Sequence, residues 1–140
     1  MTAGIFAIVG VVIGALLTHF LTDRSERRRW LANNKRAEFR ELLTAVNQSF
    51  TTILALSKNQ PFFHDDERER DLLLAETNAA RAIADRIFIA DEVGKLKLMD
   101  RWTTAARKFA RGKDTQAFGN EVNVLSEDIR KMALKEIGNL

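Results

Sequence analysis

The chain has 140 residues, with 22 Lys and Arg against 19 Asp and Glu, so its formal net charge at neutral pH is +3. This mixture of signs argues against a dedicated nucleic-acid-binding protein, because such proteins carry a one-sided basic surface. The absence of cysteine excludes disulfides and thiolate metal sites.

An uncharged apolar stretch opens the chain. Residues Ala3 to Leu21 read AGIFAIVGVVIGALLTHFL and contain no Lys, Arg, Asp or Glu. As one helix they would be roughly 28 Å long, close to the hydrocarbon thickness of a bilayer. A cleaved signal peptide fits less well, because no basic residue precedes the stretch and no Ala-x-Ala site follows it. We therefore predict a transmembrane anchor over residues 1–22.

A basic segment follows the predicted anchor. Residues 24–40 hold seven basic and two acidic side chains. Because basic residues are retained on the cytoplasmic side, we predict a single-pass protein of the cell inner membrane, with its amino terminus outside and its carboxyl-terminal domain in the cytoplasm. We expect residues 23–34 to form a juxtamembrane linker, with a hinge at Asn33–Asn34. Four arginines are predicted to contact anionic lipid headgroups: Arg24, Arg27, Arg28 and Arg29.

Small residues recur at a spacing of four within the predicted span. Gly10, Gly14 and Thr18 follow this spacing, which lets two membrane helices approach closely and favours a homo-oligomer. Because glycine is also common in membrane helices in general, a span without self-association is the alternative.

Residues 35–140 predict an all-α antiparallel bundle of three to four helices. The first runs from Lys35 to about Ser57, with apolar residues at steps of three and four, and Pro61 follows its end. Its predicted inward residues are Phe39, Leu42, Leu43, Val46, Phe50, Ile53 and Leu54. The second begins at Asp66 and reaches about Ile89. Its predicted inward residues are Leu72, Leu73, Ala79, Ala80, Ile83 and Ile87.

Two further helices complete the predicted bundle. One starts at a cap on Asp91 and reaches Phe109, with Trp102 or Thr103 facing inward, and one long helix that includes the second is the alternative. The last follows a turn at Gly112 and a cap on Asp114. Its heptad suits the bundle or an intermolecular coiled coil, and its positions are Phe118, Val122, Leu125, Ile129, Met132 and Glu136.

One cluster of residues suggests metal binding. His64, Asp65 and Asp66 are consecutive, with Glu67 and Glu69 close by, but a capped helix start explains this pattern better than a metal site. Trp30 and Trp102 indicate core or interface packing rather than base stacking. The chain has no phosphate-binding loop and no nucleophile motif, so we expect no enzymatic activity, cofactor or metal.

The order of anchor, basic segment and helices resembles a loose class of small bacterial single-pass membrane proteins with a cytosolic helical domain. The stretches RAEFRELLTAV, RAIADRIFIADEVGKL and DIRKMALKEIG carry this resemblance. It implies a bacterial or phage origin and no particular activity.

Two functions fit these features. The first is a non-enzymatic interaction or scaffold module that recruits or senses a protein partner at the cytoplasmic face of the membrane. The alternative is a membrane-active oligomerising protein, such as a phage lysis factor, a spanin-like protein with reversed topology or a toxin-like effector. In both, the lipid bilayer is a partner and nucleic acid is not.

Overall fold

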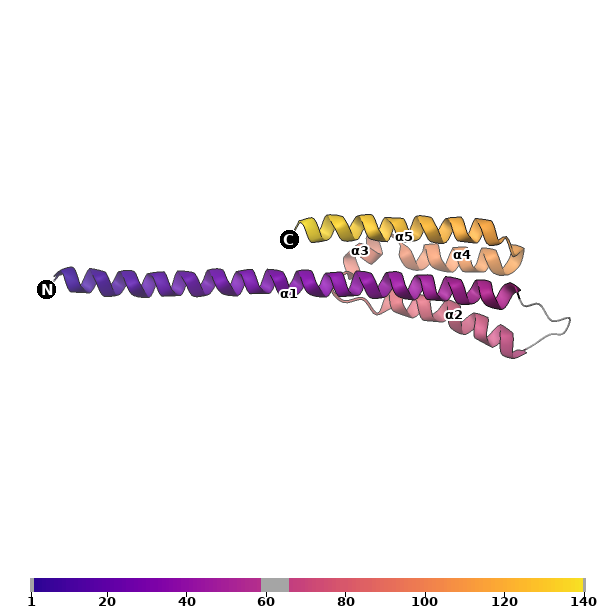
Figure 1. The fold of residues 1–140 in the computed structure, drawn as a ribbon, viewed down its shortest axis with the longest axis horizontal. Coiled ribbons are helices and arrows are strands. Elements are labelled where there is room, and N and C mark those ends of the chain that lie inside the picture. The colour runs from indigo at the N-terminus through magenta and orange to yellow at the C-terminus, as the bar shows by residue number, and fades with distance from the viewer. Residues whose placement is uncertain (1, 59–65, 140) are drawn as a thin grey trace.

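The computed structural model of the chain describes residues 2–58 and 66–139, with side chains from residue 15 onward. The helices are α1 (Thr2–Lys58), α2 (Asp66–Ala84), α3 (Ala90–Lys95), α4 (Leu98–Gly112) and α5 (Thr115–Gly138). Four of them, α1, α2, α4 and α5, run side by side and alternate in direction, while the first part of α1 projects beyond the others (Figure 1). The predicted all-α antiparallel bundle is confirmed.

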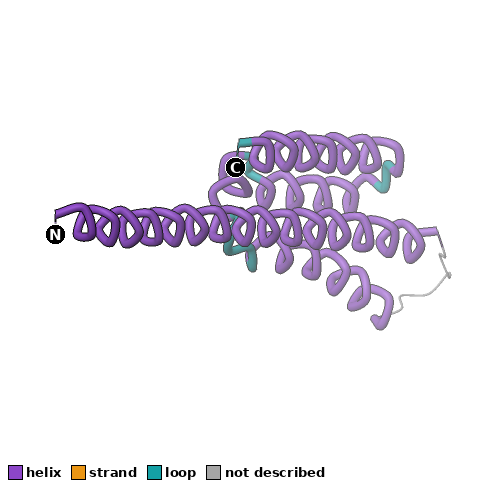
Figure 2. The backbone as a smooth tube through the Cα atoms, turned by 60° about the vertical axis from the view of Figure 1, so that its left-hand side comes forward, coloured by secondary structure: helices purple, strands orange, loops and turns teal. Residues whose placement is uncertain are grey.

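The four long helices close into a ring. Helix α1 contacts α2 and α5, and α4 contacts the same two helices from the opposite side. Figure 2 shows this arrangement from a second direction, with the projecting part of α1 standing clear of the other helices. Helix α3 is a short connecting turn at the end of the bundle from which α1 projects (Figure 1).

The core of the bundle follows the predicted stripes of the first and last helices. Leu42, Val46 and Ile129 are completely buried. The ring of Phe118 packs against Phe50, Phe109 and Trp102, with centroid distances of 5.2, 4.7 and 6.1 Å. Other buried residues of these stripes are Phe39, Ile53, Val122 and Leu125, while Leu43, Leu54 and Met132 are partly buried. These interior contacts make the last helix part of the chain's own core.

Helix α1 is continuous through the predicted linker. It extends over 57 residues and does not break at Asn33–Asn34. The side-chain amide of Asn34 donates a hydrogen bond of 2.8 Å to the carbonyl oxygen of Trp30, inside the same helix. The expected hinge is therefore not seen, because the helical turns on either side of the two asparagines continue through them.

The second predicted helix is shorter than expected. Helix α2 ends at Ala84, and residues 85–89 form a turn that leads into α3. Leu73 and Ile87 were predicted to face inward, but their side chains are 63% and 77% exposed. The β-branched and aromatic residues of this turn disfavour helix, and the side chain of Glu38 binds its backbone N–H groups instead.

The predicted third helix is divided into α3 and α4. Lys97 adopts a left-handed conformation with φ of 51°, which ends α3 and redirects the chain. Asp91 does not cap α3, since Ile89 occupies that position and no side chain bonds the helix end. Trp102 and Thr103 were the alternatives for one inward position of this predicted helix. Trp102 is fully buried and Thr103 is partly exposed, so Trp102 is the inward residue.

The turn between α4 and α5 is close to the predicted one. Asp114 caps α5, and its carboxylate accepts a hydrogen bond of 3.0 Å from the N–H of Ala117. The left-handed residue of the turn is Lys113, with φ of 52°, and Gly112 is the last residue of α4.

The predicted membrane anchor falls mostly outside the described side chains. Within the described residues, no helix is long and apolar enough to cross a membrane. The side chains of residues 1–14, which form most of the predicted span and include Gly10 and Gly14, are not among those described. The span and its self-association stay predictions.

Candidate interaction surface

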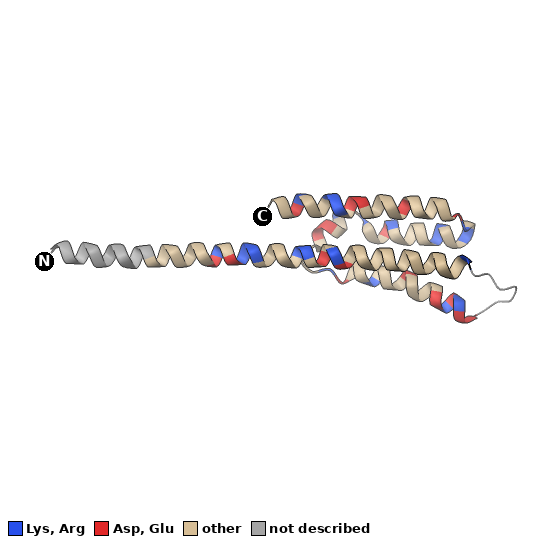
Figure 3. Cartoon of the chain, viewed as in Figure 1, with Lys and Arg blue, Asp and Glu red and all other residues tan. Residues whose placement is uncertain are grey.

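The part of α1 that forms a wall of the bundle has an uncharged outer side. Between Glu41 and Lys58, sixteen consecutive residues include no Lys, Arg, His, Asp or Glu. The exposed residues among them, which we call the uncharged face, are Thr44, Asn47, Gln48, Thr51, Thr52 and Ala55. By contrast, each of the other long helices carries several charged side chains on its exposed side (Figure 3).

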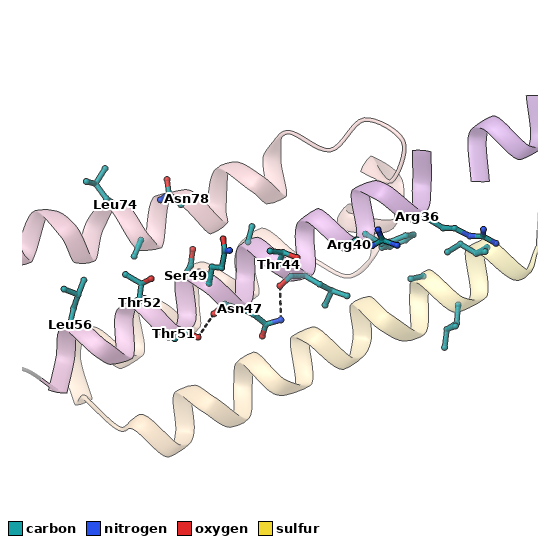
Figure 4. A pocket seen from close by; sticks show the side chains of 18 of the residues that line it. Arg36, Arg40, Thr44, Asn47, Ser49, Thr51, Thr52, Leu56, Leu74 and Asn78 are labelled. Carbon is teal, nitrogen blue, oxygen red and sulfur yellow. Dashed lines mark hydrogen bonds between the residues drawn. The ribbon is translucent and has the colours of Figure 1, made fainter. Parts of the chain in front are cut away.

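Two polar side chains of the uncharged face bind the helix's own backbone. The amide nitrogen of Asn47 donates to the carbonyl oxygen of Leu43 at 2.8 Å, and the hydroxyl of Thr51 donates to the carbonyl oxygen of Asn47 at 2.9 Å (Figure 4). Donors satisfied in this way lose little when water is removed, because they keep their partners. These two donors can therefore be buried at a low cost.

A groove runs along this face between its neighbouring helices. Its volume is about 1630 Å³. Helix α1 lines it along most of its length, while Leu74 and Asn78 come from α2 and Leu134 and Ile137 come from α5. Arg36 and Arg40 of α1, which precede the uncharged face, and Asp71 of α2 also line it (Figure 4). The side chains of Leu74 and Leu134 are 53% and 76% exposed, so each presents apolar surface to a molecule lying in the groove.

Ionic groups concentrate at the end of the bundle from which α1 projects. The ammonium group of Lys35 lies 3.0 Å from a carboxylate oxygen of Glu92 and 3.3 Å from one of Glu136. The hydrogen bond that Lys35 donates to Glu92 raises the pKa of Lys35. Burial acts to raise the pKa of Glu92, but its hydrogen bond with Lys35 acts in the other direction and the pKa is lowered overall. This cluster joins α1, α3 and α5 and stabilises the bundle rather than forming a site for a ligand.

The predicted lipid-contact arginines lie on the projecting part of α1. Arg24, Arg27, Arg28 and Arg29 are all exposed, and Arg27 is 3.9 Å from Asp23 one turn earlier. Thr18 is exposed on the same part of the helix. Trp30 is 59% exposed, and its ring packs edge-on against Phe88 at a centroid distance of 5.3 Å. Trp30 is thus the residue at which the bundle begins to cover α1.

The other candidate sites are not supported as sites of chemistry. His64 and Asp65 lie outside the described residues. Among the residues that are described, no three His, Cys, Asp or Glu side chains are placed to hold a metal ion. Trp102 is buried, and its indole N–H donates to the carbonyl oxygen of Glu76 at 3.1 Å, so its role is to join α4 to α2.

Comparison with known proteins gives no relative for this chain: no protein-family model, curated protein or solved structure matches it.

The uncharged face was not predicted from the sequence, although the sequence shows the lack of charge between Glu41 and Lys58. An exposed helix side in a chain that is 29% charged is expected to carry charges every few residues. A helix with an apolar inner stripe and only Thr, Ala, Asn and Gln on its outer side departs from this pattern.

Proposed function

We propose that this protein is a non-enzymatic, membrane-anchored interaction module, with its helical bundle held at the cytoplasmic face of the inner membrane. The observation that carries the proposal is the continuity of α1, which extends from the apolar stretch into the core of the bundle. The described large apolar residues at the end of this stretch are between 53% and 69% exposed. They are Leu16, Leu17, Phe20 and Leu21. A hydrocarbon environment would cover them, because the other described residues do not.

The arrangement of charges supports the orientation. Basic residues follow the apolar stretch directly on the projecting helix (Figure 3). Near an anionic leaflet each exposed arginine contributes on the order of 1 kcal/mol to binding. From Leu21 to Lys35 the helix rises by roughly 21 Å, which sets the height of the bundle above the hydrocarbon.

A continuous helix also couples the anchor to the bundle mechanically. A flexible linker would let the bundle rotate freely, whereas a helix transmits tilt and rotation from one end to the other. A partner bound at the uncharged face of α1 would therefore be held in a defined orientation to the membrane. This suits a module that recruits or senses a protein partner there.

Flotation of the full-length protein with vesicles that contain anionic lipid tests the anchor. We expect the protein to float and to resist extraction by carbonate. Replacing Ile8→Lys and Val12→Lys together should release it, because a charged residue near the centre of a span costs about 2.5 to 3.5 kcal/mol. The matched control is Leu134→Lys, an exposed leucine on the bundle. A protein that stays in solution without these changes would contradict the proposal.

Orientation is tested separately with a tag at Leu140. We expect this tag to be protected when protease is added to intact spheroplasts. Digestion of the tag would show that the carboxyl-terminal domain lies outside, which is the reversed topology, and would favour a spanin-like protein. Depolarisation of cells on expression, abolished by Gly14→Leu, would favour a lysis factor or a toxin-like effector over an interaction module.

A further inference from the structure

We infer that the uncharged face of α1 binds a second copy of this chain, with the two α1 helices parallel and in register. The inference rests on the proposed function, because a shared membrane anchor gives both copies the same direction and the same height. A second copy of this chain is thus the partner that binds the uncharged face beside the groove.

The absence of charge on this face favours a second copy over a different protein. In a parallel pair related by a two-fold axis, each residue near the axis faces the same residue of the other copy. A Lys or Glu at such a position would meet its own charge, which is unfavourable. A surface for another protein has no such restriction, because its charges can meet opposite ones. The six exposed residues of the uncharged face meet the requirement of a symmetric pair, and Arg36 and Arg40 lie before this face, toward the end of the bundle from which α1 projects.

The composition of the face suits close contact between two helices. Ala55 and three threonines are small, so two helix backbones can approach. The donors of Asn47 and Thr51 are already bonded to carbonyl oxygens of α1. Their burial against a second copy therefore leaves those donors paired.

The spacing of the exposed residues defines the line of contact. Thr44, Gln48, Thr51 and Ala55 follow one another at steps of four, three and four residues, as the contact positions of parallel paired helices do. In the pair, each of them lies against its own counterpart. Leu74 and Leu134 border this line on the two sides of the groove and add apolar contact.

The contact is short, and the membrane compensates for its size. Residues 42–57 span roughly 24 Å of helix, which is a modest interface for molecules that meet in solution. Anchoring in one bilayer raises the effective concentration and removes most of the orientational search, so a modest contact is sufficient there.

Disulfide trapping of the full-length protein in vesicles tests the inference. Because the chain has no cysteine, each single substitution introduces the only thiol. We expect Thr44→Cys and Ala55→Cys each to form a covalent dimer on oxidation. The matched control is Thr77→Cys, since Thr77 is an exposed threonine on α2 whose hydroxyl also bonds its own helix, at 2.7 Å from the carbonyl oxygen of Leu73. It should not form a dimer.

Two differently tagged proteins, one with Thr44→Cys and one with Ala55→Cys, establish the direction of the helices. Parallel helices separate these positions by roughly 16 Å along the axis, so the mixed dimer should be absent. A mixed dimer without the two symmetric ones would mean antiparallel helices and would overturn the inference. Equal trapping at Thr77, or no trapping at either position of α1, would also overturn it.

A charge placed on the contact line gives an independent measurement. Gln48→Glu should weaken dimer formation by about tenfold or more, because two carboxylates would face each other. Gln116→Glu, at an exposed position of α5, should leave it unchanged. Flotation of the same samples separates the two proposals: protein that is trapped as a parallel dimer but does not float would contradict the membrane anchor and keep the dimer.

Discussion

The carboxylate of Glu38 on α1 accepts a hydrogen bond of 2.8 Å from the backbone N–H of Phe88, in the turn between α2 and α3. The same side chain accepts from the N–H groups of Ile87 and Ile89, at 3.0 and 3.1 Å. Three consecutive backbone donors thus converge on one carboxylate from a residue about fifty positions earlier. This contact fixes the place where α2 ends and joins that turn to the long helix.

We expect Glu38→Ala to destabilise the bundle by about 1–3 kcal/mol, because it leaves three backbone donors without their acceptor. Glu38→Gln keeps an acceptor and should cost less. Glu127→Ala is the control, since it removes only an exposed carboxylate that lies 3.7 Å from Arg130, a contact worth about 0–1 kcal/mol. Urea unfolding of a fragment that begins at Trp30 measures all three. Equal losses for Glu38→Ala and Glu127→Ala would contradict this role of Glu38.

Ile129→Ala and Lys131→Ala test the place of α5 in the core. Ile129 is completely buried, and truncation of such a side chain typically costs about 2–5 kcal/mol. Lys131 is exposed two residues later, and its removal should change the free energy of unfolding by at most about 0.5 kcal/mol. Thermal melting of the same fragment compares them. Small and equal shifts would mean that α5 is a detachable arm.

The cluster around Lys35 predicts a particular dependence on pH. The pKa of Glu92 is below its ordinary value of 4.5 in the folded chain, so its contribution to stability is present above that pH and is lost as the pH falls through the lower folded value. The pKa of Lys35 is above its ordinary value of 10.5, so its contribution is present below that pH and is lost as the pH rises through the raised folded value. The cluster therefore stabilises the bundle across the neutral range.

Lys35→Met should reverse the way in which acid pH affects the stability contributed by Glu92. Without the ammonium group, Glu92 loses the hydrogen bond that lowers its pKa most, and burial, the largest influence on this pKa, favours the neutral form. The variant should melt well below the unchanged protein at pH 7, and the gap between them should narrow as the pH falls toward 4. Melting temperatures of the two proteins across this range provide the measurement. A gap that widens on acidification would show that the buried carboxylate does not depend on Lys35.

The continuity of α1 predicts a narrow distance distribution between spin labels placed at Ser25 and Thr44, in labelled protein diluted with unlabelled protein so that only distances within one copy are measured. Nineteen helical residues separate these positions by roughly 28 Å, and a helix without a hinge gives one sharp distance. Asn33→Pro, which removes a backbone donor and clashes with the preceding turn, should broaden the distribution. Labels at Thr44 and Thr77, both within the bundle, serve as the control and should not respond. A broad distribution before the proline is introduced would place a hinge at Asn33–Asn34.

Local signals in the sequence determined much of this fold. The stripes that include Val46 and Ile129 predicted which sides of the first and last helices are buried, because apolar residues at steps of three and four share one helix face. Asp114 predicted the start of α5, because a carboxylate just before a helix binds its free N–H groups. The uncharged opening stretch, with the arginines behind it, led to the predicted anchor and its orientation.

The tertiary structure decided the features that depend on contacts between distant residues. The end of α2 depends on Glu38, which no pattern within residues 66–89 could indicate. The exposure of Ile87 follows from the same early end, since this residue lies in the turn beyond α2, whereas Leu73 is exposed because the buried side of α2 follows Ala75, Ala79 and Ile83. The division of α3 from α4 requires Lys97 in a left-handed conformation, which a lysine adopts only where the packing on both sides holds it. The lack of charge on the outer side of α1 could be read from the sequence, but the groove that α2 and α5 form beside it could not, because periodicity gives a helix face but not its neighbour.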